Sequence, residues 1–128
     1  MQTRAQKDLQ MAYELVSRVQ EQYPDAKNET KSIHSQLCKQ FPIMVLQSGL
    51  CQTLAFHADK AKKDDARAKA HQIILQHIAQ IMNVETALTS VQTCGVLKYI
   101  YFTRRILEAW VFFKRFAVSA LKLEKEVT

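Results

Sequence analysis

The scarcity of helix breakers is the feature of this sequence that most constrains its fold. The chain of 128 residues contains only two glycines and two prolines, whereas residues that favour helices, such as alanine, leucine and glutamine, are plentiful. Strand-rich domains need many tight turns, and this chain lacks the residues that form them. With 48% hydrophobic residues the chain can bury one ordinary core, but it is too short to divide comfortably into two domains. We therefore expect residues 1–128 to form a single all-α domain.

Hydrophobic residues recur at spacings of three and four along the chain, and these spacings predict a compact bundle of about five to six helices. The first helix is expected to end near Tyr23. Its predicted inward face consists of Ala5, Leu9, Ala12, Val16 and Val19. After a polar loop, Thr30 or Ser32 is expected to cap a second helix. The predicted inward residues of that helix are Ile33, Leu37 and Phe41.

Pro42 and Gly49 shape the predicted third helix. Because proline is tolerated in the first turn of a helix but not inside it, Pro42 is expected to open this helix. Gly49 then falls within it, where glycine costs about 0.5–1 kcal/mol relative to alanine. We expect its reason to be close approach, by a neighbouring helix more often than by a ligand. The inward residues of this helix are Met44, Val45, Leu50, Leu54 and Ala55.

A charged segment, residues 59–65, separates this region from a fourth helix that ends near Met82. A short fifth helix is expected over about residues 85–92, with a stop at Thr93-Cys94-Gly95. The predicted inward residues of the fourth helix are Ile74, Ile78, Ile81 and Met82. The longest helix runs from about Tyr99 to Lys125. Its predicted core face is Ile106, Ala109, Trp110, Phe113, Ala117, Ala120 and Leu121.

Several classes of protein are disfavoured by the composition. The longest apolar stretch, residues 97–121, is interrupted by four cationic side chains, so it does not resemble a membrane span. The N-terminus lacks the apolar run of a signal peptide. Three widely spaced cysteines suit reduced thiols better than a disulfide framework. We therefore expect a soluble cytoplasmic protein that does not bind a membrane.

The sequence offers no constellation of residues for catalysis. The four histidines form no HExxH motif, and there is no GxSxG elbow or glycine-rich phosphate loop. His34 and Cys38 lie four apart on one predicted helix face, but two ligands alone do not close a zinc site. Cys51 is expected to be a core residue, and Asp64-Asp65 belongs to a solvated connection. We expect no enzyme activity, metal, cofactor or small-molecule substrate.

The net charge of +6 favours an acidic partner, with nucleic acid first. When the last helix is projected at about 100° per residue, Arg104, Arg115 and Lys122 fall nearly on one line opposite Trp110, with Lys114 on one flank. Such a ridge could neutralise phosphates without reading bases. The alternatives are an ordinary solvated face and pairing of Lys114 or Arg115 with Glu108 or Glu14.

Three apolar residues, Leu107, Val111 and Val118, fall between the core face and this ridge. An apolar patch on the outside of a monomer is uncommon. We therefore predict that they pack against a neighbouring subunit or against the first helix.

The motifs along the chain resemble those of one family. The central segment reads Lys39-x-x-Pro42, then Gly49-Leu50, then Gln52-x-x-Ala55-Phe56. Arg4, Ala12 and Val16 precede it, and Trp110 followed by Lys114-Arg115-Phe116-Ala117 comes after it. This order resembles the small subunit of the type III-B (Cmr) CRISPR RNA-targeting complex. Cys51 departs from the pattern, where a small residue is common, and residues 83–98 match poorly.

The resemblance implies a non-catalytic all-α subunit that stacks with copies of itself along the inner filament of an RNA-guided complex. Its partners would be the other Cmr subunits and the duplex of guide (crRNA) and target RNA, in antiviral defence. It implies RNA-backbone contacts from Lys114 and Arg115 first, and then from Arg104, Lys122 and Lys39, with Arg105 a weaker candidate. The alternative function is a helical protein-interaction module that binds an acidic protein and does not contact RNA.

Overall fold

The computed structural model describes residues 1–25 and 27–127, and for residues 120–127 it describes the backbone alone. Within these ranges the chain forms six helices and no strand, which confirms the all-α prediction. The helices are α1 (Arg4–Gln22), α2 (Glu29–Ser48), α3 (Leu50–Lys60), α4 (Ala66–Met82), α5 (Ala87–Thr93) and α6 (Val96–Val127).

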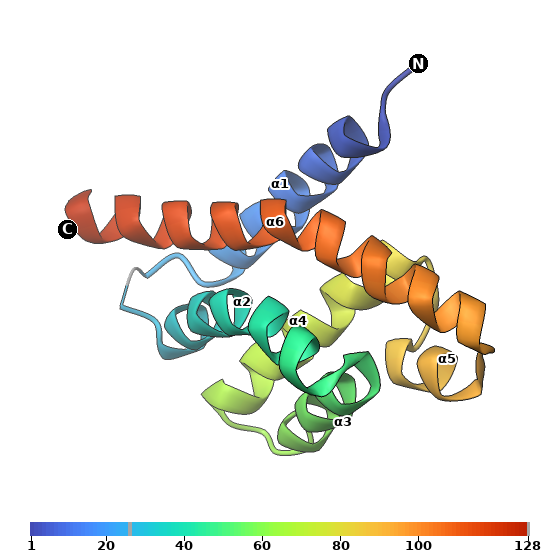
Figure 1. Ribbon diagram of the computed structural model, residues 1–128. Coiled ribbons are helices and arrows are strands. Elements are labelled where there is room, and N and C mark those ends of the chain that lie inside the picture. The colour runs from blue at the N-terminus through green and yellow to red at the C-terminus, as the bar shows by residue number, and fades with distance from the viewer. Residues whose placement is uncertain (26, 128) are drawn as a thin grey trace.

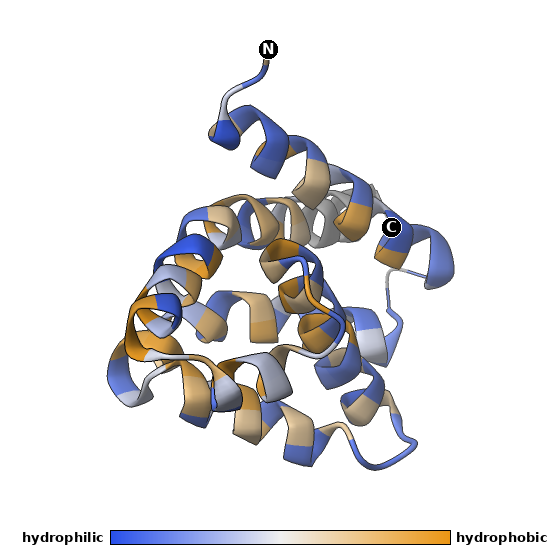
Figure 2. Ribbon diagram, turned by 90° about the vertical axis from the view of Figure 1, so that its right-hand side faces the viewer, coloured by the Kyte–Doolittle hydropathy of each residue, from blue (hydrophilic) through white to orange (hydrophobic). Residues whose placement is uncertain are grey.

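The long helix α6 organises the bundle. It contacts α1, α2 and α4, while α3 packs on α4 and α5. In Figure 1, α6 crosses the molecule above α2 and α4, and α5 lies beneath its first turns. Apolar and polar stretches alternate along the helices in Figure 2, as expected for amphipathic helices. The centre of the core contains Phe41, Ile74, Ile78, Ile106, Trp110 and Phe113, all fully buried.

The first helix begins with a capping box, in which the Thr3 hydroxyl accepts from the Gln6 backbone N–H at 3.1 Å. Its inward face is shorter than predicted. Ala12, Val16 and Val19 are buried as expected, whereas Ala5 and Leu9 are exposed. Asp8 is buried in their place, because the guanidinium of Arg105 from α6 lies against its carboxylate.

The predicted break at Pro42 is wrong, because α2 continues through this residue to Ser48. A proline inside a helix has no N–H for the carbonyl four residues earlier, which is that of Cys38. The indole Nε1–H of Trp110 donates to this carbonyl at 2.9 Å. A donor from α6 thus satisfies the acceptor that Pro42 leaves open, and the helix tolerates the proline.

The helix boundary lies instead at Gly49, which is not inside a helix as predicted but between α2 and α3. Its φ of 85° and ψ of 163° form a conformation that is essentially restricted to glycine. A Cβ here would lie 3.5 Å from the Tyr99 hydroxyl, an ordinary contact. The conformation, rather than the expected close approach, therefore explains the glycine.

Two smaller predictions in this region are also wrong. The cap of α2 is Asn28, whose Oδ1 accepts from the Lys31 N–H at 3.1 Å, rather than Thr30 or Ser32. Ala55 is exposed on α3 rather than inward.

The second half of the chain follows the predicted pattern closely. The predicted end of α4 at Met82 and its four inward residues are confirmed. The short helix α5 is present, and α6 begins slightly earlier than expected, at Val96. The predicted core residues of α6 are buried from Ile106 to Ala117. Ala120 and Leu121 belong to the part whose side chains are not described. No helix among the described residues is both long enough and apolar enough to cross a bilayer.

Candidate partner-binding groove between helices α2 and α6

Helices α2 and α6 form the two walls of a groove of about 740 Å³. Six of the eight residues predicted to bind partners line it: Lys39, Leu107, Val111, Lys114, Arg115 and Val118. Pro42 and Ile43 from α2 complete the apolar part of the lining. Arg104 is exposed on α6 but does not line the groove. The Lys122 side chain lies outside the described residues.

Two hydrogen bonds define the direction of the walls. The Trp110 indole donates to the carbonyl of Cys38, and the Ser35 hydroxyl donates to the carbonyl of Ala117 at 3.5 Å. Residue numbers on α2 therefore rise as those on α6 fall, so the helices are antiparallel. This arrangement places Lys39 toward the Lys114 end of the groove. It places Pro42 and Ile43 toward the end formed by Leu107 and Val111.

The aliphatic side chains of this groove are partly open to solvent. Val111 and Ile43 are each 55% exposed, and Leu107 and Val118 are half-buried. The wall opposite them comes from α2, so the prediction that they could pack against the first helix is wrong. We still predict that these aliphatic side chains pack against a neighbouring subunit.

The cations of the groove have no carboxylate partner among the described side chains. The alternative that Lys114 or Arg115 pairs with Glu108 or Glu14 is wrong, because Glu108 contacts Arg4 instead, at 3.8 Å. Lys114, Arg115 and Lys39 are all exposed. The groove therefore combines aliphatic side chains with a group of cations, Lys39, Lys114 and Arg115, toward one end.

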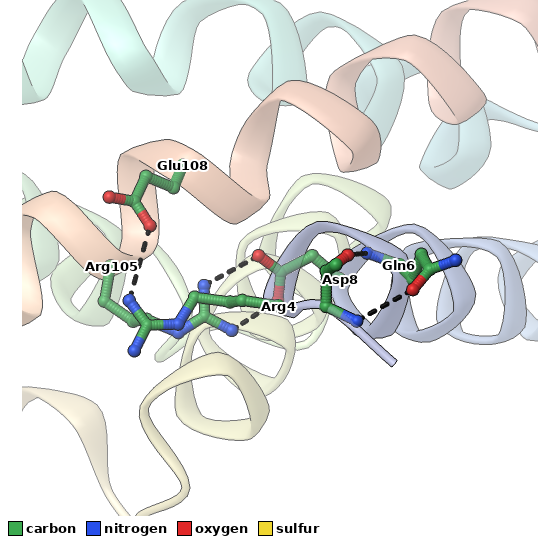
Figure 3. A network of polar contacts seen from close by, with 6 residues as sticks. Arg4, Gln6, Asp8, Arg105 and Glu108 are labelled. Atoms are coloured by element: carbon green, nitrogen blue, oxygen red, sulfur yellow. Dashed lines mark hydrogen bonds and ion pairs between the residues drawn. The ribbon is translucent and has the colours of Figure 1, made fainter. Parts of the chain in front are cut away.

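Arg105 differs from the other cations of α6. Its Nη1 donates to Oδ2 of Asp8 at 2.8 Å, and its Nη2 contacts Oδ1 of the same carboxylate. Figure 3 shows this bidentate pair joining α1 to α6, beside the contact between Arg4 and Glu108. The hydrogen bond to Asp8 raises the pKa of Arg105. Its side chain is only 12% exposed, so Arg105 fastens α1 to α6 and is not available to a partner.

All four histidines are buried, and they lie in two pairs. His57 and His71 approach each other with their Nδ1 atoms 2.8 Å apart, and the rings of His34 and His77 lie 5.6 Å apart, edge to face. Burial lowers the pKa of His34 and of His57 to about 4, and that of His77 to about 3. Sequence reasoning missed these pairs, because the members of each pair come from different helices and have no common spacing.

The predicted proximity of His34 and Cys38 is confirmed, with Nε2 and Sγ 3.5 Å apart. Burial raises the pKa of the Cys38 thiol, so it stays protonated and unreactive. In the portion of the chain with described side chains, no three or more histidine, cysteine or acidic residues gather to hold a metal ion.

Comparison with known proteins identifies the family. A family model described as "CRISPR-associated protein (Cas_Cmr5)" matches residues 4–120. The "CRISPR system Cmr subunit Cmr5" of Thermus thermophilus is 30% identical over 125 residues, which covers 95% of this chain and 99% of that protein. The crystal structure of a CRISPR-associated Cmr5 family protein, also from Thermus thermophilus, superimposes with a TM-score of 0.73, at 30% identity. That match covers 93% of this chain and 97% of the other. These matches confirm the resemblance seen in the motifs, and the chain belongs to the Cas_Cmr5 family of CRISPR-associated proteins.

Proposed function

We propose that this chain is the small, non-catalytic subunit of a type III-B (Cmr) CRISPR effector complex. Copies of it stack along the inner filament and hold the duplex of guide and target RNA in antiviral defence. The observation that carries this proposal is that Arg104, Lys114 and Arg115 on α6 are exposed and have no carboxylate partner among the described side chains, in a chain of the Cas_Cmr5 family. The relative from Thermus thermophilus is itself named a Cmr subunit.

The proposed RNA contacts are to the sugar–phosphate backbone. In RNA-guided complexes base pairing reads the sequence, so the protein needs only charge and shape to hold the duplex. At least one of Lys114 and Arg115 contacts phosphate, and Arg104, Lys122 and Lys39 extend the surface. Lys and Arg side chains at these positions neutralise phosphates without discriminating among bases.

The protein contacts in this proposal involve the aliphatic side chains beside those cations. Leu107, Val111 and Val118 contact a neighbouring subunit of the assembly. One core receives side chains from all six helices, which supports a single domain over residues 1–128. The reactions of the complex belong to its other subunits, as the family resemblance implies.

Charge reversal on α6 tests the RNA contacts. A complex reconstituted with the double variant Arg115→Glu and Lys122→Glu should bind target RNA more weakly. The slope of log affinity against log salt should fall by about one for each lost phosphate contact. Lys63→Glu, in the exposed loop between α3 and α4, is the matched control. Unchanged target affinity in a complex that retains the double variant would refute the RNA contacts.

The aliphatic part of the groove favours a second candidate, a protein-interaction module that binds an acidic protein without touching RNA. Nuclease footprinting of the purified complex separates the two functions. Protection of RNA at the position of this subunit supports the leading proposal. Loss of the subunit from the complex with no change in the footprint supports the second.

A further inference from the structure

The outer side of α6 carries a second apolar stripe that the bundle leaves partly open. It continues the line of the groove toward the start of the helix. Its aliphatic members recur at spacings of three, four or seven: Leu97, Ile100, Leu107, Val111 and Val118. Leu97 is 84% exposed and Ile100 is 46% exposed. Spacings of three, four and seven residues place side chains along one side of a helix, where they can pack against another helix.

The groove is long enough to hold about three turns of a helix. Its α6 wall runs from Leu107 to Val118, which corresponds to about 16 Å or three turns at 1.5 Å per residue. On the α2 wall, Ile43 is followed one turn later by Leu46, which is 76% exposed. An amphipathic helix laid between two such walls buries one apolar face, which is a common mode of peptide recognition.

Charge defines the chemistry of the occupant. Lys39 and Lys114 lie in the groove from opposite walls, and neither has a carboxylate partner among the described side chains. Lys114 lies on the α2 side of α6, whereas Arg115, 100° further around the helix, lies on the outer lip. A helix that fills the groove must therefore bring a carboxylate to Lys39 and Lys114, because a desolvated ammonium group without a partner is costly.

Two other occupants fit these observations less well. Single-stranded RNA is usually held by stacking its bases on aromatic rings, and none of the described residues lining the groove is aromatic. A second copy of this chain would bring further positive charge, since the net charge is +6. One of its exposed aliphatic segments, residues 96–101, carries Lys98 rather than a carboxylate.

We propose that the α2–α6 groove holds an amphipathic helix from a different protein subunit. Aliphatic side chains of that helix pack on Ile43, Leu107 and Val111, and one of its carboxylates pairs with Lys39 and Lys114. This inference rests on the proposed function, because it describes a neighbour within the assembly. It also divides the roles of the cations. Lys39 and Lys114 face protein, so Lys39 leaves the RNA-contacting set, and Arg115 faces RNA.

Photo-crosslinking in the assembled complex tests the identity of the occupant. Val111 is replaced by p-benzoylphenylalanine, the complex is reconstituted with guide RNA and irradiated, and the adduct is mapped by mass spectrometry. The expected adduct is a helical peptide of another subunit that contains aliphatic residues and Asp or Glu. An adduct to RNA, an adduct to a second copy of this chain, or the absence of any adduct at this position would overturn the proposal. The same probe at Gln52, exposed on α3, is the positional control.

Substitution of the groove measures its contribution to assembly. Val111→Asp and Lys114→Glu should each lower the affinity of the chain for the rest of the complex by about tenfold or more, as expected for central interface residues. The controls are Leu9→Asp on α1, also an exposed aliphatic residue, and Lys63→Glu, which should leave the affinity unchanged. Circular dichroism of the isolated variants checks the fold, which the exposure of Val111 and Lys114 should preserve.

The outcomes separate this inference from the proposed function. If the wild-type chain does not enter the complex, the proposed function fails. If the wild-type chain enters and both groove variants enter with equal affinity, only the groove proposal fails.

Discussion

The hydrogen bond between Trp110 and the carbonyl of Cys38 explains how α2 tolerates Pro42, and it can be tested by a double-mutant cycle. Trp110→Phe retains an aromatic ring against Phe41 and Phe113, whose ring centroids lie 4.7 and 5.1 Å from that of Trp110. It removes the indole N–H, so the buried Cys38 carbonyl loses its donor from α6. Pro42→Ala restores a backbone N–H four residues after Cys38, which can donate to the same carbonyl.

The expected magnitudes follow from this exchange of donors. A buried acceptor left without a partner costs about 1–3 kcal/mol, and the smaller ring adds a cavity cost in Trp110→Phe. In the wild type, Pro42→Ala gains helix propensity, while its new N–H adds little to a carbonyl already bonded to Trp110. In the Trp110→Phe background, the N–H that Pro42→Ala restores also donates to the Cys38 carbonyl, which has no donor there. Pro42→Ala should therefore stabilise that background by about 1–3 kcal/mol more than it stabilises the wild type.

Urea unfolding of the four isolated proteins, followed by far-ultraviolet circular dichroism, measures the cycle. The coupling is the difference between the two effects of Pro42→Ala on the free energy of unfolding. If the two effects agree within about 0.5 kcal/mol, the residues are not coupled and our explanation of the proline is refuted.

Three further predictions concern stability. Arg105→Ala leaves the buried carboxylate of Asp8 unpaired and should lower the free energy of unfolding by about 3–5 kcal/mol. The control Arg104→Ala should change it by less than about 0.5 kcal/mol. Equal effects of the two variants in urea unfolding would contradict the buried pair. Gly49→Ala should cost about 1–3 kcal/mol, because alanine is strained at a φ of 85°, and an unchanged melting temperature would rule this out. Acidification should destabilise the protein, because burial lowers the pKa values of His34, His57 and His77 from 6.5 to about 4 or below. Between these pH values the unfolded chain binds more protons than the folded protein does. The histidine contribution to stability should be constant above about pH 6.5. It should fall toward pH 4 by up to about 1.4 kcal/mol per pH unit for each of these histidines. A melting temperature that does not change between about pH 7 and about pH 5 would contradict the buried neutral state of these rings.

Much of the fold could be predicted from local patterns. The all-α class, the end of α4 at Met82 and the buried stripe from Ile106 to Ala117 all follow from helix-forming composition and apolar spacings. The family could be recognised because its motifs keep their order along the chain. The aliphatic residues Leu107, Val111 and Val118 were distinguishable from the core, because helix geometry alone separates these faces.

The wrong predictions at Pro42 and on the inward face of the first helix share one physical cause, which is a partner from a distant part of the chain. Pro42 was predicted to start a helix because its missing N–H is visible in the local sequence. Helix α2 tolerates this proline because of Trp110, which lies 68 positions later in the sequence. Ala5 and Leu9 were predicted to face inward, but Asp8 is buried instead, because its pairing with Arg105 exists only after α1 packs on α6. Neither partner is marked by spacing in the sequence.

The groove illustrates the same division. The sequence by itself determined that cations and aliphatic residues share the outer side of α6, because helix periodicity orders side chains around a single axis. Only the tertiary structure decided that α2 lies beside this stripe in the antiparallel direction, bringing Lys39 to the cationic end and Ile43 to the aliphatic end. Helix periodicity acts over a few residues, whereas the groove depends on how two distant helices pack against a common core.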